Sequence, residues 1–245
     1  MDLADEARLA VSGGEAPAGT ITIGAPETVC AYRLPAVLHL FRSRFPRVRL
    51  IFRPTPSPGL PHSVGDGALD VAFILAAPIQ SGRLMVEPLV AERLVVLAPP
   101  DHPLAQAPRV GAADLEGEPI LLTKTGCGYR ALFSRALAAE GVHPSETVEF
   151  GSVEAIKQCA MAGLGIAVLP EVAVAAELAE GRLRAPRWVG PELRAWTQMV
   201  WHREKRLAPA LSAFLGVARE LLAAAPEPSH ESRQARGDGG EPRVA

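Results

Sequence analysis

The sequence has 245 residues, of which 48% are hydrophobic and 21% charged, and its formal net charge is −2. Because single cores rarely grow far beyond ~200 residues, a chain of this length is expected to form two lobes. The charge offers no positive field for DNA or an anionic membrane, and neither a signal peptide nor an apolar stretch of ~18 residues is present. We therefore expect a cytoplasmic protein without membrane contact.

The first predicted element is the end of a helix. Apolar side chains recur at helical spacing over residues 3–11, and a Ser-Gly-Gly breaker follows at residues 12–14. We interpret residues 1–18 as the remnant of a linker helix together with its linker.

From residue 20 onward the pattern alternates between strand and helix periodicity. The expected elements are a strand at 20–24, a helix at 34–45, a strand at 48–52, a short helix before Gly67 and a strand at 70–74. This order is typical of a parallel, doubly wound lobe.

A second series of the same kind follows a strand-like segment at residues 93–98. Its expected elements are strands at 120–123, 147–150, 166–169 and 195–202, and helices at 129–137, 152–162 and 207–222. The last strand and helix are expected to return to the first lobe. Residues 226–245 are rich in proline, glycine and charge, cannot offset their ordering entropy by burial, and are predicted to form a disordered tail.

The segment at residues 161–170, Met-Ala-Gly-Leu-Gly-Ile-Ala-Val-Leu-Pro, is the most informative single feature. We expect Gly163 to adopt the left-handed conformation that ends a helix, and Gly165 to let the chain turn back tightly. The apolar run at residues 166–169 suits a strand covered on both faces, as in a parallel α/β sheet.

Several motifs occur in a fixed order along the chain. They are residues 19–24, Leu34-Pro35, residues 45–48, residues 67–72, residues 102–104, residues 126–130, residues 152–156 and the glycine segment at 161–170. Together they resemble the effector-binding domain of LysR-type transcriptional regulators, over roughly residues 19–222. The resemblance implies an α/β fold of the periplasmic-binding-protein-like type, with two Rossmann-like lobes joined by two crossing strands. It implies lobe I at residues 19–96 plus 196–225 and lobe II at residues 97–195.

The resemblance also implies a function, which is to sense a small, anionic metabolite in the cleft between the lobes. It implies a homodimer or tetramer through lobe surfaces, with the helices at 34–45 and 152–162 as candidates. Full-length members begin with a winged helix-turn-helix that this sequence lacks, so DNA contact is expected only through such a domain in a parent protein. Neither a cofactor nor an enzymatic activity is expected.

Ligands of open α/β sheets bind beyond the carboxyl ends of the strands, where helix N-termini present free amide groups. The residues predicted to bind the effector are Thr28, Val29, Ser57, Thr123, Lys124, Gly126, Cys127 and Thr197. Other interpretations remain open for four of them. Thr28 could only cap or pack at a helix start, Ser57 could cap a helix that begins late after the prolines of 54–61, Lys124 could be solvated, and Thr197 could serve a sheet edge.

Cys127 has three interpretations: a small pocket filler, an effector contact, or a redox-active thiol favoured by a helix N-terminus and Arg130. The third is weakened because the following helix, residues 131–140, contains no cysteine that could pair with it. Cys30 and Cys159 are expected to be small buried residues.

No local motif predicts a catalytic site or a metal-binding site. The six histidines are scattered, no Ser, His and Asp arrangement can be assembled, and the glycines do not form a phosphate-binding fingerprint. A stand-alone solute-binding protein and a cytosolic enzyme on a similar scaffold remain alternatives. Few aromatic residues are expected near the cleft, with Tyr129 the nearest, which favours a compact polar effector.

Overall fold

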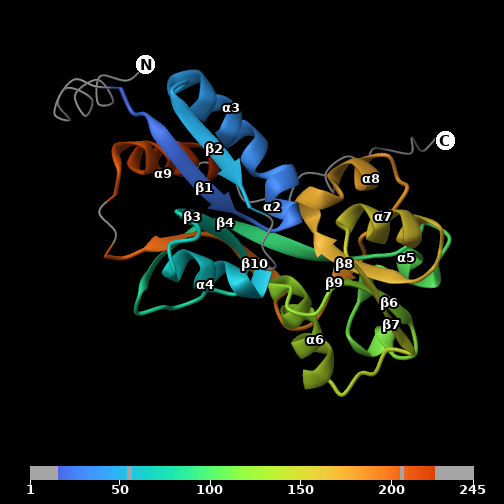
Figure 1. The fold of residues 1–245 in the computed structure, drawn as a ribbon. Coiled ribbons are helices and arrows are strands. Elements are labelled where there is room, and N and C mark those ends of the chain that lie inside the picture. Colours follow the sequence, from blue (N-terminus) through green and yellow to red (C-terminus); the bar gives the residue numbers. More distant parts are fainter. Residues whose placement is uncertain (1–15, 54–56, 205–206, 224–245) are drawn as a thin grey trace, which may run out of the picture.

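The computed structural model describes residues 16–53, 57–204 and 207–223 and shows the expected α/β fold, with two Rossmann-like lobes joined by two crossing strands (Figure 1). The predicted helix at residues 3–11 and the predicted tail at residues 226–245 lie outside these ranges. The boundaries proposed for lobe I and lobe II stay predictions.

A single twisted sheet runs through both lobes in the order β2-β1-β3-β10-β4-β8-β6-β7. Its strands are β1 (Gly19–Gly24), β2 (Val48–Phe52), β3 (Val71–Ala76), β4 (Leu84–Leu97), β6 (Pro119–Thr123), β7 (Glu146–Phe150), β8 (Ile166–Pro170) and β10 (Arg194–His202). In the first lobe β1 pairs in parallel with β2 and β3, and in the second β6 pairs in parallel with β7 and β8. A separate two-stranded ladder joins β5 (Arg109–Val110) to β9 (Arg187–Trp188).

The two long strands β4 and β10 form the connection between the lobes. They pair antiparallel from Arg93↔Arg194 to Leu84↔His202, while β10 also borders β3 and β4 borders β8. The described sheet is therefore hydrogen-bonded from one lobe into the other.

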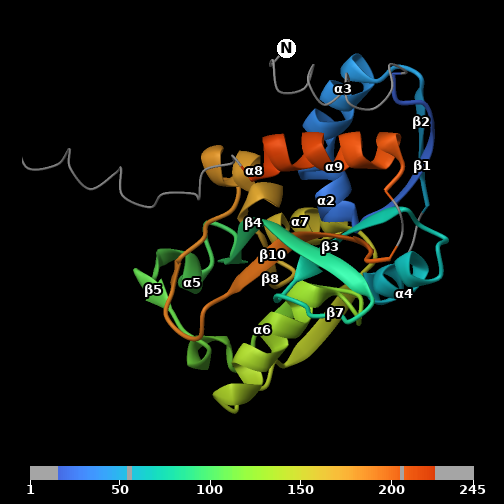
Figure 2. The same ribbon diagram turned by 90° about the vertical axis from the view of Figure 1, so that its left-hand side faces the viewer.

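Helices cover both faces of this sheet, as Figure 2 shows for α3 and α9 on one face and α4 and α6 on the other. The helices are α2 (Glu27–Tyr32), α3 (Leu34–Arg44), α4 (Leu60–Gly65), α5 (Pro103–Gln106), α6 (Gly128–Ala139), α7 (Val153–Met161), α8 (Ala175–Ala179) and α9 (Pro209–Leu222), with short 3-10 turns η1 (Ser57–Gly59), η2 (Ala113–Leu115) and η3 (Glu171–Ala173). The rings of Phe41 in α3 and Phe214 in α9 pack edge-on with centroids 5.2 Å apart. This contact confirms that the last helix returns to the first lobe.

The hydrophobic core is continuous between the lobes. One buried cluster extends from Ile21 in β1 through Leu94 in β4 to Leu169 in β8, and all three side chains are at most 2% exposed. A smaller cluster lies under α4. The shared core ties the two lobes together by burial of apolar surface, in addition to the strand pairing.

The predicted strand at residues 93–98 was too short, because β4 begins at Leu84. The reason is Pro88, a residue that disfavours a central strand but is tolerated at a bulge. The register of β4 and β10 shifts between Thr197, which pairs with Val90, and Gln198, which pairs with Pro88. The proline therefore sits beside an irregularity of the ladder.

The glycine segment behaves partly as expected. Gly163 has φ +80° directly after the C-cap of α7, so its predicted left-handed conformation is confirmed. The chain does turn back between the end of α7 at Met161 and the start of β8 at Ile166, but the φ of Gly165 is not positive, so a left-handed conformation does not account for this glycine. A side chain at Gly165 would instead collide with the backbone carbonyl of Pro119 in β6. Gly165 thus permits close packing of β8 against β6.

Candidate functional site

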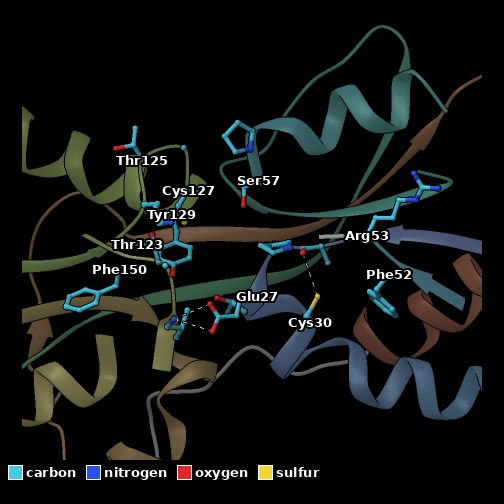
Figure 3. A pocket seen from close by; sticks show the side chains of 18 residues that line it. Glu27, Cys30, Phe52, Arg53, Ser57, Thr123, Thr125, Cys127, Tyr129 and Phe150 are labelled. Atoms are coloured by element: carbon cyan, nitrogen blue, oxygen red, sulfur yellow. Dashed lines mark hydrogen bonds between the residues drawn. The ribbon is translucent and has the colours of Figure 1, made fainter. Parts of the chain in front are cut away.

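A cavity of about 630 Å³ lies between the lobes, where four parallel strands end (Figure 3). It is lined by residues 25–28 and Cys30 after β1, by Phe52, Arg53, Ser57 and Pro58 at the end of β2, by residues 123–127 and Tyr129 after β6, and by Phe150, Gly151 and Val153 after β7. In Figure 3 the side chains from β6 and β7 face those from β1 and β2 across the space. The geometry is that of ligand sites in open α/β sheets.

Six of the eight predicted site residues line this cavity. They are Thr28, Ser57, Thr123, Lys124, Gly126 and Cys127. Val29 is fully buried in the core of the first lobe and does not line it. Thr197 is also fully buried, and its hydroxyl donates to Glu92 Oε1 at 2.9 Å, away from the cavity lining.

Thr28 is the second residue of α2 and is 4% exposed. Ser57 begins the 3-10 turn η1, and α4 starts only at Leu60 with Gly59 as an N-cap that makes no side-chain hydrogen bond. The expected late start of this helix is therefore confirmed. Ser57 does not cap α4, and its side chain is directed toward the cavity in Figure 3.

The loop after β6 brings the lobes into contact at two glycines. Gly126 has φ +93°, and a Cβ placed on it would lie 2.5 Å from Pro58 Cγ of the first lobe. A Cβ on Gly128 would lie 2.5 Å from the carbonyl oxygen of Leu75 in β3. Such approaches require glycine, so the position of this loop against the first lobe depends on both residues.

Glu27 connects the lobes across the cavity. Its carboxylate accepts the backbone N–H of Val153 at 3.2 Å and the hydroxyl of Ser152 at 3.3 Å. Ser152 is the N-cap of α7 but makes no cap hydrogen bond of its own. An acidic group of the first lobe therefore supplies the N-terminal cap of a helix in the second, where the helix dipole favours negative charge.

The cations of the site differ in their surroundings. Lys124 is exposed, and no ion pair involves it within the described ranges. Arg130 donates to the carbonyl oxygen of Thr123 at 2.7 Å and pairs with Glu149 at 2.7 Å, a hydrogen bond that lowers the pKa of the Glu149 carboxyl. Lys124 is consequently the cation of this loop that is available to an anionic ligand.

Burial raises the pKa of two groups that line the cavity. The pKa of the Tyr129 phenol is raised mainly by desolvation and further by nearby Cys127, and the pKa of the Cys30 thiol is raised by desolvation and by Glu27. Both groups therefore stay protonated at neutral pH. Cys30, Cys127 and Cys159 are all free and half-buried, so the expectation that Cys30 and Cys159 are buried residues was wrong.

Sequence reasoning missed several lining residues, among them Glu27, Cys30, Phe52 and Phe150. Phe52 and Phe150 are the last residues of β2 and β7, so the same rule that placed Thr123 at the end of β6 could have found them. Three aromatic side chains therefore line the cavity, those of Phe52, Tyr129 and Phe150, rather than that of Tyr129 alone. No sequence signal placed Glu27 against a helix that begins 126 residues later.

The buried pair of Arg33 and Glu92 lies beside the crossing strands. Arg33 Nε donates to Oε1 at 2.7 Å and Nη2 to Oε2 at 2.6 Å, and Glu92 is 3% exposed. Together with the Thr197 hydroxyl, Arg33 satisfies a carboxylate that would otherwise be costly to bury. Thr197 thus has a structural role at the hydrogen-bonded junction of β4 and β10.

Across residues 16–53, 57–204 and 207–223, no group of three or more His, Cys, Asp or Glu side chains is placed to hold a metal ion. Within the same ranges no helix has both the length and the apolar character required to cross a bilayer.

Comparisons with known proteins agree with this architecture. The family model described as LysR substrate binding domain matches residues 14–223. A Bacillus subtilis (strain 168) relative named uncharacterized HTH-type transcriptional regulator YwqM is 39% identical over 221 residues, which cover 90% of this chain and 75% of the relative.

Two solved structures share the fold. The Synechocystis PCC6803 CcmR regulatory domain in complex with 2-PG has a TM-score of 0.77 at 24% identity, covering 85% of this chain and 100% of that one. The effector binding domain of QuiR in complex with shikimate has a TM-score of 0.72 at 18% identity, covering 84% and 98%.

Proposed function

The chain belongs to the LysR substrate-binding domain family, and from this premise we propose that it senses a small anionic metabolite in the cavity between its lobes. It is an effector-sensing regulatory domain of the LysR type. The CcmR and QuiR domains were solved with 2-PG and with shikimate, and what we carry over from them is a small molecule as ligand.

The observation that carries the proposal is the convergence of four strand ends on one cavity of about 630 Å³. This volume is in the range of small-molecule sites, and unpaired Lys124 gives the cavity a positive side chain. We propose Thr28, Ser57, Thr123, Lys124, Gly126 and Cys127 as effector contacts. Val29 and Thr197 would act indirectly, by holding α2 and the crossing strands in place.

The regulatory response would be a change in the relative position of the lobes. A ligand that binds one arrangement better than the other shifts their populations, and this shift can alter how copies of the chain assemble. The exposed side of α3, with a shallow hollow of about 440 Å³ lined by Leu38, His39, Arg42 and Ser43, is a candidate surface for a dimer or tetramer. DNA contact would come from a helix-turn-helix domain of the parent protein, acting in the cytoplasm.

A binding role is favoured over catalysis because the B. subtilis relative is named a transcriptional regulator. A turnover assay on small organic acids tests this preference directly. Sustained product formation by the purified chain would contradict it.

The test of the proposed site is a thermal-shift screen of a metabolite library, repeated with Thr28→Val. Valine preserves the volume of buried Thr28, which lines the cavity, and removes its hydroxyl. The matched control is Thr20→Val, because Thr20 is exposed at the opposite end of the same β1 unit. We expect the best ligand to lose most of its stabilising shift in Thr28→Val only. A shift that survives both Thr28→Val and Ser57→Ala would show that the ligand binds elsewhere.

A further inference from the structure

Two hydroxyl groups at the cavity are buried without a hydrogen-bond partner. The oxygens of Thr123 and Tyr129 both have this property in the described part of the chain. Tyr129 as a residue is only 3% exposed, and both residues line the cavity. The Tyr129 hydroxyl approaches the side chains of Thr28 and Thr123, but none of these approaches reaches hydrogen-bonding geometry.

Unpaired buried hydroxyls are rare because each loses its bonds to water and gains nothing in return. Neither oxygen is reached by solvent in this conformation. A group that is left unsatisfied at a ligand cavity is explained when the ligand, on binding, provides the missing partner. Tyr129 lies in the first turn of α6, whose N-cap Cys127 makes no side-chain hydrogen bond.

We propose that Tyr129 and Thr123 determine effector specificity by donating their two hydroxyl protons to one uncharged oxygen of the effector. This inference rests on the proposed function of the cavity and names the chemical class that it would take. The class is a small organic acid that carries, besides its anionic group, a second oxygen that accepts hydrogen bonds, as in a 2-oxo acid.

The charges at the site indicate which group of the effector each side chain would bind. Lys124 is exposed and unpaired within the described residues, so it suits the anionic group at the wet side of the cavity. The surroundings of Tyr129 are buried, and an ionised group placed there would lose its hydration. A neutral oxygen loses less hydration free energy when it is buried, and hydrogen bonds from the two hydroxyl donors compensate for that loss. The raised pKa of the Tyr129 phenol keeps its proton available for donation.

Neither hydroxyl oxygen is reached by solvent, so contact with an effector requires a small displacement of the groups around them. The segment between Thr123 and Tyr129 packs closely against the first lobe at Gly126 and at Gly128. Binding would therefore couple recognition of the second oxygen to a shift between the lobes. An arrangement in which both hydroxyls are unpaired would then be less stable than one in which the effector accepts hydrogen bonds from them.

The experiment compares Tyr129→Phe with Tyr32→Phe, because these are the two tyrosines of the chain. Tyr32 is in α2, outside the cavity lining, and its hydroxyl accepts a hydrogen bond from Lys157 at 3.4 Å. The ligands are matched acids with and without the 2-oxo group: 2-oxoglutarate and glutarate, oxaloacetate and succinate, pyruvate and propionate. Melting temperatures of the free chain and dissociation constants from calorimetry are measured for the wild type and both variants.

The expected results are opposite for the two variants. Tyr129→Phe leaves the melting temperature of the free chain unchanged or higher, and weakens binding of the preferred 2-oxo acid about tenfold or more. The advantage of that 2-oxo acid over its matched acid disappears in the same variant. Tyr32→Phe lowers the melting temperature and leaves the affinity unchanged. Thr123→Val should behave like Tyr129→Phe.

Three outcomes overturn the inference. They are equal affinity of wild type for both members of every pair, unchanged affinity in Tyr129→Phe, and a fall in melting temperature for Tyr129→Phe as large as for Tyr32→Phe. If a library acid binds with dependence on Thr28 but not on Tyr129, the proposed function stands and this inference fails. If no acid binds the wild type, the anionic effector of the proposed function fails as well.

Discussion

The carboxylate of Glu27 and the backbone N–H of Val153 are 3.2 Å apart and belong to different lobes. Both residues line the cavity, and their contact supplies a partner for a free backbone N–H in the first turn of α7. The position of the second lobe is therefore coupled to the charge at residue 27.

Replacing Glu27 should loosen this end of the cavity. Glu27→Ala removes the cap of α7 and should lower the free energy of unfolding by about 1 kcal/mol, whereas Glu27→Gln, which keeps an acceptor, should lower it less. Urea denaturation gives the stability, and the alkylation rate of Cys30, which lines the same cavity, reports opening. Glu146→Ala is the control, since Glu146 is exposed at the start of β7. An unchanged alkylation rate in Glu27→Ala would mean that the contact does not hold the lobes together.

Breaking the pair of Arg33 and Glu92 should be among the most destabilising single changes at the crossing strands. Arg33→Met leaves the carboxylate of Glu92, whose side chain is 4% exposed, without its cation. We expect this change to lower the free energy of unfolding by about 3 kcal/mol. The double variant Arg33→Met/Glu92→Leu should be more stable than Arg33→Met alone, because no charge remains buried.

The control for this experiment is Arg44→Met. Arg44 pairs with Glu220 at the surface, where the side chains are 32% and 47% exposed, and such pairs contribute about 0.2–1 kcal/mol. Urea denaturation measures the free energy of unfolding of both variants. An equal decrease in Arg33→Met and Arg44→Met would contradict the role assigned to the buried pair.

Gly128 should not tolerate a methyl group. Its Cβ would lie 2.5 Å from the carbonyl oxygen of Leu75, and backbone atoms cannot withdraw as a flexible side chain can. We expect Gly128→Ala to lower the free energy of unfolding by about 2 kcal/mol. Gly216→Ala is the matched change, since Gly216 is inside α9 with open space around it, and should stabilise the chain by about 0.5–1 kcal/mol. A neutral Gly128→Ala would show that α6 can move away from β3 without loss.

The stability of the chain should decline at alkaline pH through Tyr129. Burial raises the pKa of this phenol in the folded state, so its contribution is fully present below the unfolded pKa of about 10 and is lost as pH rises above that value, by at most about 1.4 kcal/mol per pH unit. Tyr129→Phe should remove this part of the decline in unfolding free energy with rising pH. Urea unfolding at intervals from pH 8 to pH 11 measures it, and parallel curves for the two proteins would refute the assignment.

The local pattern of the chain was sufficient for the parallel units and for six of the residues that line the cavity. Alternation predicted the strands that end at Gly24, Phe52 and Thr123 to within one or two residues, and the rule that ligands bind beyond such ends then located Thr28, Ser57 and Cys127. The strands and the location of these three residues at the cavity were predictable because each depends on a strand and the few residues that follow it, whereas their contact with an effector stays a prediction.

What the sequence did not reveal depends on contacts between distant segments. Pro88 concealed the first half of β4, since only pairing with β10 shows that it sits at a bulge. Thr197 was predicted at the ligand because it lies near a crossing, but its hydroxyl is committed to Glu92. The unpaired state of the Tyr129 hydroxyl is likewise invisible without the positions of its neighbours.

Arg33 occupies a position with a mechanical consequence. It is both the C-cap of α2, which lines the cavity, and the N-cap of α3, which carries the candidate surface for assembly. Its guanidinium is fastened by two bonds to β4. A tilt of α2 on binding would therefore reach α3 through a residue whose side chain is held to β4, which links the cavity to the candidate surface for assembly.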